Sequence, residues 1–250
     1  MKKLLFSGTL LVLTTSAALA GTLNLNYGGG CWSDGTPLAA KTFACDTNTG
    51  NVQFTASFIP TVAKTDWLGM MAILDGTTWP GVGLPDWWQL SNTGACRSAA
   101  LSVSGDFTSA PQIGCVDPFQ GQAQGGIAAY QTTLYPPPFP INVPPPNRFR
   151  LKVGLGMMTN ISIPGDGTEY YAFRGTINYT KTIGTGACGG CSTPLAMVLT
   201  EIGSTGEASG VEYIMMPASN NCLAWQPGPA GCYIVPARAT TWGQVKSLYR

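Results

Sequence analysis

Eight cysteines, all behind an N-terminal stretch with the layout of an export signal, constrain this chain more than any other feature. Lys2 and Lys3 form a short basic head, residues 4–13 are mostly apolar, and Ala18-Leu19-Ala20 precedes Gly21. This order is typical of a secretory signal peptide, and its apolar run is too short to cross a membrane. The sequence therefore predicts that residues 1–20 are removed and that the rest folds in an oxidising compartment, where cysteines pair.

The expected disulfides follow the order of the cysteines, which is Cys31, Cys45, Cys96, Cys115, Cys188, Cys191, Cys222 and Cys232. Eight cysteines allow 105 pairings, and pairing of sequence neighbours is the simplest expectation: 31–45, 96–115, 188–191 and 222–232. The Cys188-Gly-Gly-Cys191 motif has two other interpretations, a redox pair and half of a zinc site. Its flanks do not resemble a βαβ redox unit, and a second closely spaced pair is missing, so a small disulfide is the favoured interpretation.

Short alternating segments between turn residues predict the fold class. Glycine (32) and proline (19) are abundant, which favours turns and short strands over long helices. Residues 22–27, 52–58 and 148–153 alternate between apolar and polar side chains with the period of a strand, while residues 68–74 are continuously apolar, as in a strand covered on both faces. The sequence predicts an all-β, antiparallel sandwich, jelly-roll or immunoglobulin-like, stapled by disulfides. Residues 21–250 are expected to form one domain with a proline-rich loop at 136–146.

Charge and residue type exclude several function classes. Only 10% of the residues are charged, against about 25% in ordinary proteins, and without Lys2 and Lys3 there are 11 basic and 12 acidic residues. Such a surface predicts no nucleic-acid partner. The chain has no histidine, so a Ser-His-Asp or Cys-His catalytic site cannot be built. No metal-ligand or cofactor motif stands out, and none is expected to be bound.

Tryptophans are the residues with the clearest binding potential. Trp79, Trp87 and Trp88 lie in one aromatic segment, and a strand would direct adjacent Trp87 and Trp88 to opposite faces. One of the two would then be core and the other exposed, where a flat indole stacks on a sugar ring or another apolar face. The competing interpretation is that the sandwich uses its tryptophans to fill its core.

Carboxylates are the remaining groups able to carry catalysis. Glycoside hydrolysis needs two of them at a suitable separation, and the sequence marks no such pair. The available acidic residues are Asp66, Asp86, Asp106, Asp117, Asp166, Glu169, Glu201 and Glu212. Several stand beside glycine, where turn formation is the better interpretation.

The closing segment Thr241-Trp-Gly-Gln-Val-Lys-Ser-Leu-Tyr-Arg250 resembles the end of a set of uncharacterised exported bacterial proteins. The segments 41–48, 84–89, 125–131 and 184–191 are similar to that set as well. The resemblance implies a secreted β-rich protein and carries no known activity. It suggests that Trp242–Arg250 acts as a last strand or as a recognition segment for export or assembly.

Together these features predict a non-enzymatic exported protein, secreted, periplasmic or at the cell surface, that works as a structural or interaction component of a surface, matrix or filament. Expected partners are further copies of the chain or surface glycans, and no membrane span is expected after cleavage. A carbohydrate-binding module using Trp79, Trp87 and Trp88 is the first alternative. A carboxylate-dependent glycoside hydrolase is the second.

Overall fold

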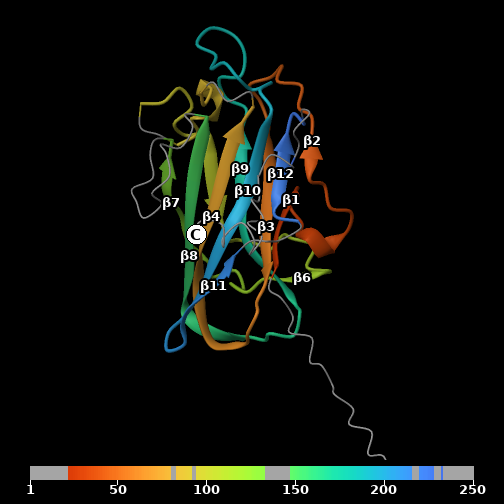
Figure 1. Ribbon diagram of the computed structural model, residues 1–250, viewed down its shortest axis with the longest axis vertical. Helices are drawn as coiled ribbons and strands as arrows, with labels where there is room; N and C mark the ends of the chain where they lie inside the picture. The colour runs from red at the N-terminus through yellow and green to blue at the C-terminus, as the bar shows by residue number, and fades with distance from the viewer. Residues whose placement is uncertain are drawn as a thin grey trace, which may run out of the picture.

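A computed structural model describes residues 22–79, 83–91, 94–132, 147–215, 220–227 and 232, and within them two β-sheets pack face to face (Figure 1). The all-β, disulfide-stapled sandwich predicted from the sequence is confirmed. The predicted signal peptide, the proline-rich loop at 136–146 and the closing segment lie outside the described residues.

The first sheet, sheet A, has the order β1-β3-β9-β5, with β6 also beside β9. Its strands are β1 (Thr22–Tyr27), β3 (Asn51–Ile59), β9 (Glu169–Asn178), β5 (Leu101–Ser104) and β6 (Cys115–Val116). All pairings in this sheet are antiparallel except β6 with β9. Apolar residues alternate along β3, so Phe54, Ala56 and Phe58 enter the core while Thr55 and Ser57 face the other way.

The second sheet, sheet B, has the order β2-β12-β10-β4-β8-β7, with β11 also beside β10. Its strands are β2 (Ala40–Lys41), β12 (Cys222–Trp225), β10 (Leu195–Gly206), β4 (Lys64–Thr78), β8 (Arg148–Ile163), β7 (Gln124–Gln131) and β11 (Gly210–Met215). Long β4, β8 and β10 run side by side along the molecule (Figure 1), and only β2 with β12 is parallel.

The core lies between the sheets and is rich in aromatic rings. Phe54 and Phe173 of sheet A meet edge to face at 6.2 Å between ring centroids. Sheet B contributes fully buried aliphatic side chains, among them Leu74, Leu151 and Leu199. Burial of such side chains stabilises a fold by about 1.5–3 kcal/mol each, so this layer supplies most of the driving force for folding.

The two outer faces of the sandwich differ. Loops 28–39 and 105–114, with the short 3-10 helix η1 (Trp32–Asp34), pack against sheet A. On sheet B, β4 alternates, with Met70, Ala72 and Leu74 buried and Met71 49% exposed. The expectation that residues 68–74 are covered on both faces is therefore wrong. A continuous apolar run in sequence does not distinguish a doubly covered strand from one that carries methionine and isoleucine on its exposed face.

The disulfides join Cys31 to Cys115, Cys45 to Cys191, Cys96 to Cys188 and Cys222 to Cys232. Only the last follows the neighbour rule, so the expected 31–45, 96–115 and 188–191 pairs are wrong. The reason is topological. Cys188 and Cys191 lie in the connection from β9 of sheet A to β10 of sheet B, which meets the loop before β3 and the loop before β5. The two ends of the C-x-x-C motif thus staple different parts of the chain, and the motif is neither a small disulfide nor a dithiol pair.

Candidate functional site

Trp87 and Trp88, the adjacent pair expected to divide between core and surface, are both fully buried. They belong to the 3-10 helix η2 (Asp86–Trp88), not to a strand, and this helix is covered on both sides. Their ring centroids lie 5.0 Å and 5.1 Å from that of Trp225 in β12, and the Trp87 Nε1–H donates to Thr182 Oγ1 at 3.1 Å. The expected exposed indole at this pair is therefore wrong, and both side chains fill the core.

Arg97 holds this aromatic cluster in place, a role that no sequence pattern indicates. It is 2% exposed, and its guanidinium carbon lies 3.7 Å from the centroid of the Trp87 ring. Its Nη1 donates to Trp87 O at 2.8 Å, its Nε to Thr180 O at 3.0 Å, and its Nη2 to Asn178 O. Burial lowers the pKa of Arg97 to about 10. A cation bound entirely by main-chain oxygens in this way fixes the loops around η2.

Trp79 is the member of the three predicted tryptophans that reaches solvent. It follows the end of β4, is 47% exposed, and its backbone N–H donates to Pro194 O at 2.9 Å. The main chain is therefore fixed while the indole remains accessible. Of the three tryptophans expected to bind a ligand, Trp79 is the one whose ring is exposed enough to stack on it.

Two carboxylates hold the 3-10 helix η1 in place, Glu169 of β9 and Asp34 of η1 itself. Glu169 is 3% exposed and accepts hydrogen bonds from Asn24 Nδ2 at 2.8 Å, from Ser33 N at 3.2 Å, and from the hydroxyls of Ser33 and Ser57. These donors come from β1, η1 and β3, so the carboxylate ties the overlying loop to sheet A.

Asp34 fixes the same loop from its other side. It accepts from Cys31 N at 3.0 Å, Gly114 N at 2.7 Å and Ile113 N at 3.0 Å, and also from the Tyr171 hydroxyl. Burial alone would raise the pKa of Asp34, but these hydrogen bonds outweigh it and hold the pKa below its usual value. Both carboxylates thus hold the loop that contains η1 against its neighbours. The Sγ atoms of Cys31 and Cys115 lie within 4.8 Å of an Asp34 oxygen, but they are joined in a disulfide and are not thiolate ligands for a metal.

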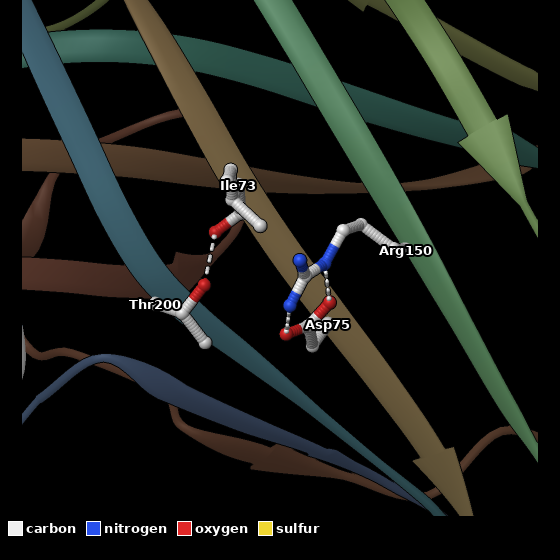
Figure 2. A network of polar contacts seen from close by, with 4 residues as sticks. All are labelled: Ile73, Asp75, Arg150 and Thr200. Atoms are coloured by element: carbon white, nitrogen blue, oxygen red, sulfur yellow. Dashed lines mark hydrogen bonds and ion pairs between the residues drawn. The ribbon is translucent and has the colours of Figure 1, made fainter. Parts of the chain in front are cut away.

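The outer face of sheet B is the remaining candidate surface. Arg150 of β8 and Asp75 of β4 form a two-pronged ion pair there, with both N–O distances at 2.7 Å, as Figure 2 shows. Beside it, the Thr200 hydroxyl donates to Ile73 O at 3.2 Å, where β10 carries a bulge. Further along this face the surface becomes apolar, with Met71 of β4 and Val211 and Tyr213 of the adjoining β11 exposed. The sequence pattern did not single out these residues, because exposed and buried apolar side chains look alike in a strand.

Comparisons with known proteins add little to this geometry. No family model matches the chain, and no curated protein matches it. One solved structure to which it is similar is the pilus backbone protein RrgB from Streptococcus pneumoniae, with 9% sequence identity and a TM-score of 0.23. That similarity covers 76% of this chain and 34% of the pilus protein, and at this level it supports no statement about fold or function. Among the described residues no helix is long and apolar enough to cross a membrane.

Proposed function

We propose that this protein is an exported, non-enzymatic structural component of a cell surface, matrix or extracellular filament, and that it associates with further copies of itself. The disulfide set is the observation that carries the proposal. Three of the bridges join residues 84, 92 and 146 positions apart, and two of them tie the connection from β9 to β10 to the loops before β3 and β5. Bridges of this kind persist in oxidising compartments, and they favour a rigid body over one that changes shape.

The roles of the polar groups support a structural body over an enzyme. Glu169, Asp34 and Arg97 are each bound to the loops that they hold in place. The chain also has no histidine to act as a general base at neutral pH. Structural use of its carboxylates is the economical interpretation.

The test is electron microscopy of the native extracellular fraction, together with gel filtration of the purified protein across a concentration series. Self-association predicts ordered assemblies in micrographs and species larger than one chain on the column. A monomer at every concentration, with no assemblies in the native fraction, would rule out the proposed self-association.

A carbohydrate-binding role is the second candidate, and the exposure of Trp79 favours it. A sugar bound at this ring would quench tryptophan fluorescence, and the Trp79→Ala variant would lose the response. A glycan array that detects no ligand would exclude this candidate while leaving the structural role unaffected.

A further inference from the structure

We propose that the outer face of sheet B binds the same face of a second copy of this chain, in a two-fold pair whose axis runs along β4. This inference rests on the self-association proposed above and identifies the surface responsible. Three features support it. The face has an apolar row, the adjacent row carries a positive charge on β8 and a negative charge on β10, and a two-fold axis along β4 would place these opposite charges of the two copies against each other.

The apolar centre is one row of side chains across the sheet. Gly154 of β8, Met71 of β4, Gly203 of β10 and Tyr213 of β11 stand in register on neighbouring strands. The Met71 side chain packs over Gly154, while the side chains of Tyr213 and Val211 pack over Gly203. With Met71 49% and Tyr213 60% exposed, the row forms an apolar surface on this face of sheet B.

The charges lie in the adjacent row. Lys152 of β8, Ile73 of β4 and Glu201 of β10 are in register. Lys152 and Ile73 point away from the core because their strand neighbours are buried, and Glu201 lies on the same face because it pairs with Ile73. Among the described residues neither Lys152 nor Glu201 has an ion-pair partner, in contrast to Arg150 and Asp75 on the same face. The row therefore has a positive end, an apolar middle and a negative end.

A two-fold axis along β4, between two facing copies, places β8 of each copy over β10 of the other. Lys152 of one copy then faces Glu201 of the second, and the reverse pair forms on the other side of Ile73. Met71 of one copy meets Met71 of the other at the axis. Facing sheets pack about 10 Å apart with nearly aligned strands, a spacing that side chains of this size fill. Such an isologous contact closes on itself, so a longer assembly would need a second kind of contact.

Charge reversal tests the geometry in the full-length mature protein, with sedimentation velocity over a concentration series as the readout. K152E and E201K each place like charges together twice in the pair, so we expect each to weaken self-association at least about 100-fold. The double variant K152E/E201K restores both opposite-charge contacts and should recover pairing. Mixing the two single variants should produce a mixed pair as well, because each supplies the charge that the other needs. K41E is the matched control, since Lys41 is exposed in β2 at the far edge of the same sheet.

The outcomes separate this inference from the proposed function. The proposed surface is supported if K152E and E201K each lose self-association, the double variant recovers it and K41E associates as the parent does. All variants should keep the parental melting temperature. If the protein assembles but K152E and E201K behave as the parent does, the surface is wrong and the structural role stands. If the unmodified protein stays monomeric, both this inference and the self-association on which it rests are wrong.

Discussion

Replacing the buried Arg97 should lower the free energy of unfolding far more than replacing an arginine on the surface would. The Arg97→Met substitution leaves the carbonyls of Trp87, Asn178 and Thr180 without their charged donor. A buried acceptor left unpaired costs about 1–3 kcal/mol, and loss of the stacking on Trp87 adds about 0.5–2 kcal/mol. Removing the guanidinium also cancels its own cost of burial, which offsets part of this sum. We expect a net loss of about 3–5 kcal/mol in the free energy of unfolding.

Urea unfolding monitored by tryptophan fluorescence measures this loss, because Trp87, Trp88 and Trp225 surround the site. Arg148→Met is the matched control, since Arg148 is exposed at the start of β8, and we expect it to change stability by less than about 0.5 kcal/mol. Arg97→Lys keeps the charge but offers fewer donors, so it should recover only part of the loss. An Arg97→Met loss below about 1 kcal/mol would refute the argument that this side chain holds the loops around η2.

Three further predictions concern the Cys45–Cys191 disulfide, the buried Glu169 and the dependence of stability on pH. Cys45→Ser with Cys191→Ser should lower stability by about 4 kcal/mol in the chain-entropy model, because the bridge closes a long loop even with the other disulfides intact, and calorimetry would measure the loss. Glu169→Gln should cost about 1–3 kcal/mol in urea unfolding, because an amide cannot accept hydrogen bonds at both of its ends; an unchanged midpoint would contradict the structural role. Stability should be flat from about pH 5 to 9, because the chain lacks histidine and the described cysteines are all in disulfides. Above about pH 10 it should fall, since burial raises the pKa of several tyrosines and the unfolded chain loses those protons first, although Arg97 alone acts in the opposite direction. The tyrosines concerned are Tyr27, Tyr130, Tyr170, Tyr171 and Tyr179. Below about pH 4 stability should also fall, because hydrogen bonds lower the pKa of folded-state carboxylates such as Asp34 and Asp66. A melting temperature that varies steeply between pH 5 and 9 would contradict the predicted pH profile.

Local features of the fold were accessible from sequence. The alternation at residues 22–27 predicts β1 with its observed bounds, and the period-two pattern at 148–153 marks the beginning of β8. Strand periodicity depends only on neighbours along the chain, so it survives without knowledge of tertiary contacts.

Features that depend on tertiary contacts were not accessible. The partner of Cys45 lies 146 residues away, and no local pattern records that the connection from β9 to β10 passes beside it. Trp87 and Trp88 form a helical turn covered from both sides, where alternation would have exposed one of them. Arg97 looks like any surface arginine in the sequence, since its acceptors are main-chain carbonyls that carry no sequence signature.

Mass spectrometry of unreduced peptides from the protein in the extracellular fraction would test both export and the disulfide set. We expect a chain that begins near Gly21, with linked peptides joining Cys31 to Cys115, Cys45 to Cys191 and Cys96 to Cys188. Free thiols at these positions, an intact Met1, or linkage of Cys31 to Cys45 and of Cys188 to Cys191 would contradict this expectation.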